Sequence, residues 1–547
     1  MKTIAVLGAV AALAAASCSR QPTASGAGLH NALDLAADGV TVSGFVRDAA
    51  GAPVRGALII VADGPRSVAR FSGATGVYRI PGVPRKAVQI TVSGWGYDAQ
   101  IRQLKPDKDI AADFQLTPLL DAQTLTSAEI LTVIPANKET QWLQVRCINC
   151  HGFTQLGHLR GATHDQWLSV FKIMQLNYGR EELMPADWPY AAQLTTKYFG
   201  PDAGQPTAQT VRRVPVSDAA LKATFYMIDL PATGRVLPHS ITADNKGGAW
   251  VAEYGKYGNS IVRWDLASGA LEPIAMKMPD AGAHTPTIDH KGRIWTALIT
   301  AKQLTVIDPL TRTIEYMPLE SYPHTLSTDA DGFIWGSGQK IFRVDPETRA
   351  ITYWTPASAP RASDSWSALG RTPGAKADAR YHIGTSPLDP YHAVRDSKGM
   401  VWFTSYSTGL LTRLDPATGK QDIIRIPGVS SSRGIDIDAN DVVWFSSWAG
   451  HALVKYDPAT GKSEQFRFPT EFAAPYSIRA DKMRGYIWVA DFTGNHITRF
   501  DPRSGAFVEY PLPHNESYPR FISLDSQGRV WFAEWWNSRL GVLDPGY

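Results

Sequence analysis

The segment Val530-Trp531-Phe532-Ala533-Glu534-Trp535 belongs to the last of seven related stretches in this chain of 547 residues. Each stretch has an apolar strand start, an Asp, a Lys/Gly-type turn, and then a Trp followed by small or aromatic residues. The repeated tryptophans are Trp250, Trp295, Trp335, Trp402, Trp444, Trp488 and Trp531. Five of their six spacings, 45, 40, 42, 44 and 43 residues, match a propeller blade of four strands, and one interval of 67 residues is longer. The sequence therefore predicts a seven-bladed β-propeller over residues 222–547.

A second marker trails each Trp, an Asp turn that is usually followed by Pro. It occurs at Asp265, Asp308, Asp345, Asp415, Asp457, Asp501 and Asp544. The sequence stops soon after the seventh marker, so we expect the last blade to lack its outer strand. The run Phe225–Pro231 resembles the outer strands Ile314–Pro318 and Phe507–Pro511, and we expect it to close the ring. The one long interval holds an insertion near Ala357 to Leu388, which is expected to form a loop over one face.

Polar residues occupy one rim of the predicted propeller. The start of a blade's first strand and the end of its second strand should meet near the axis, so residues eleven before and three after each Trp should converge. With one residue inserted in blade six, the pairs are His239/Glu253, His284/Leu298, His324/Gly338, Tyr391/Ser405, Arg433/Ser447, Tyr476/Asp491 and Arg520/Glu534. The pattern predicts a polar funnel for ligand binding or catalysis, with Mg²⁺ or Ca²⁺ as a possible occupant. The alternative is that propeller rims are polar in general.

The repeats resemble the virginiamycin B lyase (streptogramin lyase) family of seven-bladed propellers. The likeness rests on the run from Pro238 to Asp244 and on Val530–Trp535, and it extends over residues ~222 to 547. In that family, a His and a Glu fourteen residues later lie on the last blade, with a His on the preceding blade and Mg²⁺ nearby. Here Arg520 and Tyr476 replace the two histidines while Glu534 remains. This departure argues against streptogramin lyase activity, because base-assisted elimination needs a placed His and metal.

The chain has three cysteines, and two of them lie in Cys147-Ile148-Asn149-Cys150-His151. In a C-x-x-C-H motif the two thiols bind the haem vinyl groups and the His is the proximal ligand of the iron. The motif therefore predicts covalently attached haem c. The alternative is a Cys147–Cys150 disulfide beside an incidental His.

Two helices are expected around this motif, one over Asp165–Met174 and one near Tyr190 to Phe199, which ends at Gly200-Pro201. Residues 125–203 then form a small all-α cytochrome c domain. The pattern resembles the monohaem cytochromes paired with molybdenum or quinone dehydrogenases, which implies Met174 as the distal ligand. Met184, in a Met-Pro pair, is the rival, and His158, His164 or an open site are further alternatives. Thioether ligation suits electron transfer, whereas an open site suits ligand or peroxide chemistry.

Residues 39–118 are expected to form a separate unit with strands at Val40–Val46, Ala57–Val61 and Val88–Val92. The pattern around these strands, with Gly76-Val77-Tyr78, resembles the carboxypeptidase regulatory-like domain, a small β-sandwich. That family has no catalytic residues of its own, so the resemblance implies a spacer or docking module. Carbohydrate or partner binding is the alternative.

The first 38 residues resemble a bacterial export signal followed by a tether. Met1-Lys2 gives a positive start, and the apolar run from Ile4 to Ala16 is too short to span a membrane. Cys18 resembles a lipoprotein cleavage site, so we expect lipidation there, with ordinary cleavage near Ala16 as the alternative. The expected location is the periplasm, with a lipid anchor in the outer membrane.

The chain carries 54 basic and 51 acidic residues, a net charge of +3, and no basic block stands out. Nucleic acid is therefore not an expected partner. The fold class is mainly β, with a seven-bladed propeller preceded by a β-sandwich and the cytochrome c domain. The expected function is a periplasmic oxidoreductase or electron-transfer protein, whose propeller binds a substrate or a redox partner protein. The alternatives are an envelope binding or sensing lipoprotein and a carbon–oxygen lyase that uses His239 and Glu253.

Overall fold

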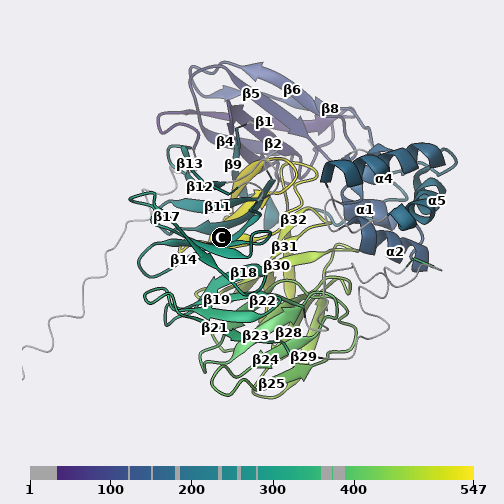
Figure 1. Ribbon diagram of the computed structural model, residues 1–547. Coiled ribbons are helices and arrows are strands. Elements are labelled where there is room, and N and C mark those ends of the chain that lie inside the picture. Colours follow the sequence, from purple (N-terminus) through teal and green to yellow (C-terminus); the bar gives the residue numbers. More distant parts are fainter. Residues whose placement is uncertain are drawn as a thin grey trace, which may run out of the picture.

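The computed structural model describes residues 34–120, 124–148, 152–178, 185–231, 237–254, 260–278, 281–358, 372–373 and 389–547. Within these ranges the chain is mainly β and forms three parts (Figure 1). A β-sandwich comes first, a helical unit follows, and seven blades of four strands each form the remainder. No helix within these ranges has both the length and the apolar character needed to cross a membrane.

The N-terminal unit has two sheets that pack around an apolar core, as the alternation of Val40–Val46 predicts. Val42 and Val46 are fully buried in this core, whereas Phe45 is 40% exposed. One sheet contains β1 (Val40–Asp48), β4 (Val77–Val83), β7 (Ile110–Ala111) and β8 (Phe114–Leu116). The other contains β2 (Leu58–Asp63), β3 (Arg66–Phe71), β5 (Val88–Ser93) and β6 (Gln100–Leu104).

The seven remaining sheets are antiparallel and follow one another along the chain. Blade one contains β10 (Leu237–Ala243), β11 (Gly248–Tyr254), β12 (Ser260–Asp265) and β13 (Leu271–Ala275). Blade two contains β14 (Ala283–Ile288), β15 (Ile294–Leu298), β16 (Gln303–Ile307) and β17 (Ile314–Pro318). Blade three contains β18 (Pro323–Thr328), β19 (Ile334–Gly338), β20 (Ile341–Val344) and β21 (Ile351–Trp354). Blade four contains β22 (Pro390–Arg395), β23 (Val401–Ser405), β24 (Leu411–Leu414) and β25 (Gln421–Ile424). Blade five contains β26 (Ile435–Ile437), β27 (Val443–Ser447), β28 (Ala452–Asp457) and β29 (Lys462–Arg467). Blade six contains β30 (Pro475–Asp481), β31 (Tyr486–Asp491), β32 (His496–Asp501) and β33 (Ala506–Pro511).

The seventh blade closes the ring in the predicted way. It contains β34 (Ile522–Leu524), β35 (Val530–Glu534) and β36 (Arg539–Asp544), and β9 (Thr224–Asp229) supplies the outer strand by pairing antiparallel with β36. The innermost strands contact each other in chain order, and β34 returns to β10. The seven tryptophan stretches therefore correspond to seven blades of a closed propeller.

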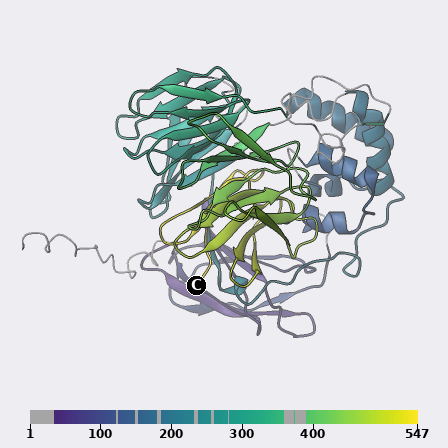
Figure 2. The same ribbon diagram turned by 90° about the horizontal axis from the view of Figure 1, so that it is seen from below.

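The outer strand of the last blade also continues into the sandwich, which the sequence did not predict. Strand β9 pairs with β3 on its other side, with Val68 opposite Tyr226. The result is one eight-stranded sheet in the order β34-β35-β36-β9-β3-β2-β5-β6. Figure 2 shows the sandwich beside the C-terminal strands drawn in yellow. Neither β3 nor β9 is left as an open edge.

The repeated Asp and Trp form a clamp within the blades. In five blades the Trp indole Nε1 donates to the Asp six residues earlier over 2.8–2.9 Å, as between Trp295 and Asp289. The same Asp accepts backbone N–H groups of its turn, for example from Arg293 at 2.9 Å. In blade six the inserted residue separates Asp481 from Trp488 by seven, and the Trp488 indole has no partner within the described residues.

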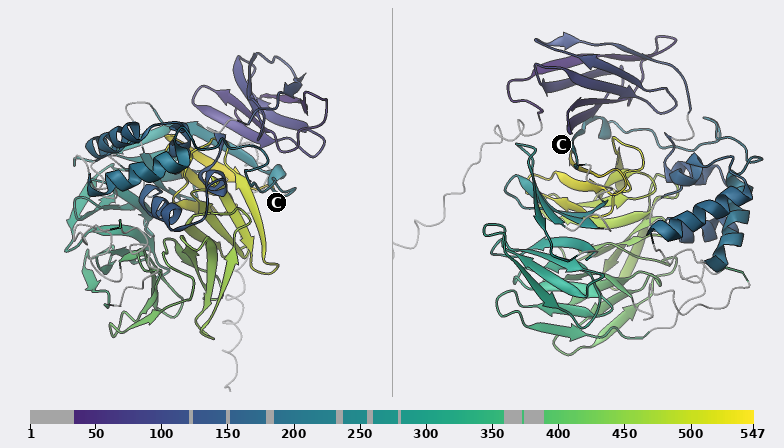
Figure 3. Two further views of the ribbon diagram at one scale, coloured as in Figure 1. Left: turned by 90° about the vertical axis from the view of Figure 1, so that its right-hand side faces the viewer. Right: turned by 45° about the horizontal axis from the view of Figure 1, so that its top comes forward.

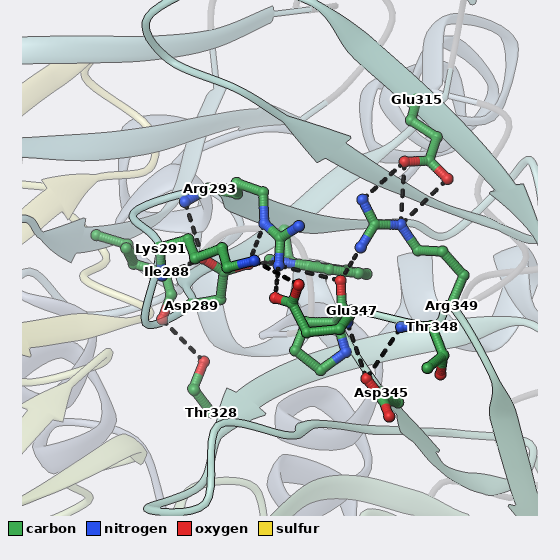
Figure 4. A network of polar contacts seen from close by, with 12 residues as sticks. Ile288, Asp289, Lys291, Arg293, Glu315, Thr328, Asp345, Glu347, Thr348 and Arg349 are labelled. Atoms are coloured by element: carbon green, nitrogen blue, oxygen red, sulfur yellow. Dashed lines mark hydrogen bonds and ion pairs between the residues drawn. The ribbon is translucent and has the colours of Figure 1, made fainter.

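Charged side chains tie blade two to blade three, as Figure 4 shows. Arg293 contacts Asp289 in its own blade and Glu347 in the next, at 2.6 and 2.8 Å. Arg349 pairs with Glu315 at 2.9 Å. Because most of these groups are partly exposed, each pair adds little stability.

The helical unit lies over one face of the propeller (Figure 3, left). It contains α1 (Ser127–Thr132), α2 (Lys138–Cys147), α3 (Thr154–His158), α4 (His164–Tyr178), η3 (Pro185–Asp187) and α5 (Trp188–Phe199), and η4 (Ala220–Lys222) precedes β9. The helices expected over Asp165–Met174 and Tyr190–Phe199 correspond to α4 and α5, and Gly200 caps α5. Helix α5 packs against both α2 and α4. Most of the Ala357–Leu388 insertion lies outside the described residues.

Candidate functional site

Seven side chains, one from the start of each innermost strand, meet around the propeller axis. We name this set the axial ring: His239, His284, His324, Tyr391, Arg433, Tyr476 and Arg520. A β-bulge in the innermost strand positions several of these side chains. The pairing of β10 with β11 skips His239, with Pro238 opposite Glu253 and Ser240 opposite Ala252. Comparable shifts occur in β14, β18, β22 and β30.

The histidines form one arc of the axial ring. His239 and His284 approach to 3.1 Å between their Nε2 atoms, and the His284 and His324 ring centres are 4.5 Å apart. Arg520 Nη1 lies 3.1 Å from His239 Nε2. Because arginine can only donate, this Nε2 accepts, and the His239 proton belongs on Nδ1, which lies 2.7 Å from the Ser240 hydroxyl.

Two tyrosines and two arginines form the other arc. The Tyr391 hydroxyl donates to the Tyr476 oxygen over 2.6 Å, and Arg520 Nη1 donates to the same oxygen over 3.4 Å. The Arg433 guanidinium lies 3.8 Å from the centre of the Trp448 ring and 4.6 Å from that of Tyr476. Six of the seven ring members are 2–8% exposed, and only His324 is partly exposed.

Burial sets the protonation of this site. It lowers the pKa of His284 well below its usual range and that of His324 to about 4, so both are neutral at pH 7. Burial also raises the pKa of Tyr391. For Tyr476 burial acts in the same upward direction, but Arg520 and Arg433 outweigh it and lower the pKa below the ordinary value.

The three predicted carboxylates do not join the axial ring in the described contacts. Glu253 contacts the Ser260 hydroxyl, and Glu534 accepts from His514 and Asn537, each at 3.1 Å. Asp491 accepts the backbone N–H of Ala474 over 2.8 Å, and burial raises its pKa to about 6. The other predicted partners are the apolar or small Leu298, Gly338, Ser405 and Ser447.

The axial ring does not fit Mg²⁺ or Ca²⁺. Within the described ranges no group of three or more His, Cys, Asp or Glu side chains is placed to hold a metal ion. The ring offers imidazole nitrogens, phenol oxygens and guanidinium groups, whereas these hard cations prefer several oxygen ligands.

Sequence reasoning missed an aromatic cage around the two arginines. Blades four to seven each have an aromatic residue four positions after the repeated Trp. These residues are Tyr406, Trp448, Phe492 and Trp535. Arg433 Nη2 donates to the Tyr406 hydroxyl over 3.2 Å, and the Arg520 guanidinium lies 4.0 Å from the Trp535 ring centre. The aromatic residue at this one position in four blades is the signal that could have predicted the cage.

The C-x-x-C-H motif lies only partly within the described residues. Cys147 is the last residue of α2 and is partly buried, while Cys150 and His151 lie outside the described residues. Met174 is partly buried against the helical core. The indole N–H groups of Trp142 and Trp167 are buried without a partner in the part of the chain described, so donors are available in this core.

The remaining predicted ligands have other settings. Met184 and the lipidation residue Cys18 fall outside the described residues. His158 pairs with Glu516 of the propeller at 3.2 Å, and His164 lies 3.5 Å from Asp165. Arg146, just before Cys147, has a buried side chain 3.7 Å from that of Asp187.

Aromatic contacts connect the haem motif to the axial ring. Gly152, which follows His151, lies so close to Tyr518 that a Cβ on it would be 2.4 Å from the Tyr518 ring. The Tyr518 ring stacks on Phe492 at 4.9 Å, and Phe492 lies 6.1 Å from the Tyr476 ring. The helical core and these aromatic residues form one apolar cluster.

Two family models match the chain. Residues 363–546 match the virginiamycin B lyase family, and residues 41–117 match the carboxypeptidase regulatory-like domain. The propeller is thus virginiamycin B lyase-like and the N-terminal unit is carboxypeptidase regulatory-like, as the sequence predicted. Neither match includes the helical unit.

Several solved structures are similar to the propeller. A streptogramin B lyase is 21% identical, with a TM-score of 0.48, over 58% of this chain and 97% of that chain. Virginiamycin B lyase from Staphylococcus aureus is 21% identical, with a TM-score of 0.47, over 58% and 99%. Hydrazine synthase from Kuenenia stuttgartiensis is 12% identical, with a TM-score of 0.44, over 57% and 97%. A search of curated proteins found no match.

Proposed function

We propose that this chain is an exported c-type haem protein that moves electrons between its helical unit and a substrate or partner at the axial ring. Cys147 and Cys150 would hold the haem, His151 would be the proximal iron ligand, and Met174 the distal one, with Met184 as the alternative. Bound haem c supplies one-electron chemistry. The proposed location is the periplasm, with a lipid anchor at Cys18.

The continuous apolar cluster is the observation that carries this proposal. Gly152 directly follows the motif and contacts Tyr518, and only Phe492 lies between Tyr518 and the axial tyrosine Tyr476. This packing supports electron exchange between the helical unit and the axial ring, because side chains of one apolar cluster extend from Gly152 to Tyr476.

The axial ring supplies binding and orientation. Arg433 and Arg520 are held by aromatic faces and hydrogen bonds, so their positive charges have fixed positions. His324 is neutral at pH 7 because its pKa is about 4, and its partial exposure gives a bound molecule a neutral imidazole to contact. Such preorganised donors orient a ligand without further rearrangement.

The lyase alternative has less support from the same geometry. Glu253 is the carboxylate fourteen residues after His239, but its described partner is Ser260 rather than a member of the axial ring. The register of β10 and β11 explains why Glu253 does not contact the axial ring. The bulge at His239 leaves Glu253 paired with Pro238. The two positions at which the family has histidines hold Arg520 and Tyr476 in this chain.

Covalent haem is tested by isolating the full-length protein from cells that attach haem c and staining it for haem after denaturing electrophoresis. We expect haem to remain on the polypeptide of the natural sequence and of the control variant Cys18→Ser, and to be lost from Cys147→Ser. A haem-free natural protein with a Cys147–Cys150 disulfide in its peptide map would overturn the proposal.

A further inference from the structure

We propose that Tyr476 is a buried tyrosinate, and that it accepts the proton of a substrate that carries an acidic hydroxyl group, of the phenol or hydroquinone class. This inference rests on the proposed function, because it assigns a substrate class and a proton acceptor to the same axial ring.

The hydrogen bonds at the Tyr476 oxygen are the first argument. Tyr391 donates to it over 2.6 Å and Arg520 over 3.4 Å, and the side chain is only 2% exposed. Arg520 can only donate, whereas in the contact between the two tyrosines either hydroxyl can donate. The 2.6 Å separation of the two phenol oxygens is the short distance typical of a hydroxyl that donates to an ionised oxygen, and an ionised Tyr476 accepts from both partners.

The surrounding charges agree with an ionised Tyr476. Arg433 and Arg520 approach it from the blades on either side, while His284 and His324 are neutral. The other groups that face it are His239, Phe492, Phe521 and the edge of Trp448. The ring positions contain no carboxylate, so a phenolate is the anion that suits two guanidinium groups.

The identity of this base selects the substrate class. Proton transfer is efficient when donor and acceptor have similar pKa values, and the best match for a tyrosinate of lowered pKa is a phenol whose own hydroxyl is acidic. Carboxylic acids have already lost their proton at neutral pH, and aliphatic alcohols hold theirs too tightly. In the proposed step the substrate O–H bond breaks, the proton forms an O–H bond on Tyr476, and the substrate becomes an anion beside Arg433 and Arg520. No electron moves in this step.

Ultraviolet resonance Raman spectroscopy of the full-length, haem-loaded protein tests the ionisation, because tyrosinate and tyrosine give separate bands. We expect one tyrosinate signal that persists below the ordinary titration range of tyrosine and is absent in Tyr476→Phe. Arg520→Gln should raise its apparent pKa by about one unit or more. Tyr510→Phe is the matched control, since Tyr510 is buried in the same blade and its hydroxyl has no partner in the described residues.

Calorimetric binding of 4-nitrophenol and of nitrobenzene tests the substrate class. We expect Tyr476→Phe to weaken 4-nitrophenol binding at least tenfold and to leave nitrobenzene binding unchanged. If Tyr476→Phe does not fold, Tyr391→Phe replaces it, with a raised tyrosinate pKa as the expected result. An ordinary tyrosine titration, or equal loss of both ligands, overturns the inference. Either result leaves the proposed haem function standing, because haem staining of the polypeptide tests that function separately.

Discussion

Gly152 of the helical unit packs closely against the Tyr518 ring of the propeller. A Cβ on Gly152 would lie 2.4 Å from the Tyr518 ring, and the Tyr518 hydroxyl donates to Gln155 over 2.7 Å. The first residue after the C-x-x-C-H motif is therefore held on the connection between blades six and seven. This contact determines where any group attached at the motif lies relative to the axial ring.

Replacing Gly152 by Ala should weaken this docking. The added methyl group would meet Ser127 Oγ at 2.0 Å as well as Tyr518, and buried overpacking of this kind costs about 1–3 kcal/mol. Thermal unfolding should show a corresponding loss of stability. Gly204→Ala is the control, because nothing lies within 4 Å of the new Cβ there. Equal stability of both variants would mean that the contact is not tight.

The two candidate distal methionines make different predictions. If Met174 binds the iron, Met174→Ala should remove the long-wavelength band of methionine ligation and lower the reduction potential, because the thioether raises it. Met184→Ala should leave the band and the potential unchanged. Visible spectroscopy and redox titration of both variants decide between them, and the opposite pattern would assign the ligand to Met184.

Stability should depend on pH through Glu509. Burial raises the pKa of this carboxyl to about 7, from an ordinary value of 4.5. The folded state thus favours the protonated form, so this contribution is complete below about pH 4.5 and is lost as the pH rises towards 7. Glu509→Gln keeps an acceptor for the Thr470 N–H and should stabilise the protein at pH 8 by about 1–3 kcal/mol.

Denaturant unfolding of the natural protein and of Glu509→Gln at pH 4 and pH 8 checks this contribution. The gain from the substitution should be small at pH 4 and appear at pH 8. The same gain at both values would show that the Glu509 carboxyl is not the source.

Removing residues 39–118 should promote self-association. The deletion uncovers the edge of β9 that pairs with β3, and it exposes Tyr226, which is 1% exposed in the intact chain. Light scattering should report oligomers of the shortened protein. Adding Tyr226→Lys should reduce this association, because a charge on a strand edge disfavours pairing. A monomeric shortened protein would contradict the prediction.

Much of the fold could be predicted because its determinants repeat. The Trp recurs once in every blade and the Asp-to-Trp clamp is formed in five of them, so the spacing of Trp residues reports the blade count. The closing strand β9 could be recognised because it resembles other outer strands. The pairing of β3 with β9 was not predictable, since two strand edges carry no sequence signal for each other.

The axial site was predictable only in part. The residues eleven before each Trp, or twelve before it in blade six, do meet, because each lies at the start of an innermost strand. Their expected carboxylate partners turn elsewhere, since the bulge at His239 leaves Glu253 opposite Pro238. A single bulged residue changes which side chains share a face, and sequence spacing alone does not reveal it.

The most direct test of the central claim is the visible spectrum of the oxidised, haem-loaded protein under anaerobic conditions while hydroquinones and fractions of small molecules from its host are added. We predict that a small molecule reduces the haem, and that Arg433→Gln slows this reduction more than the distant control Arg503→Gln. Reduction by other proteins only, with Arg433→Gln unchanged, would contradict a substrate site at the axial ring and leave the propeller as a docking or sensing surface.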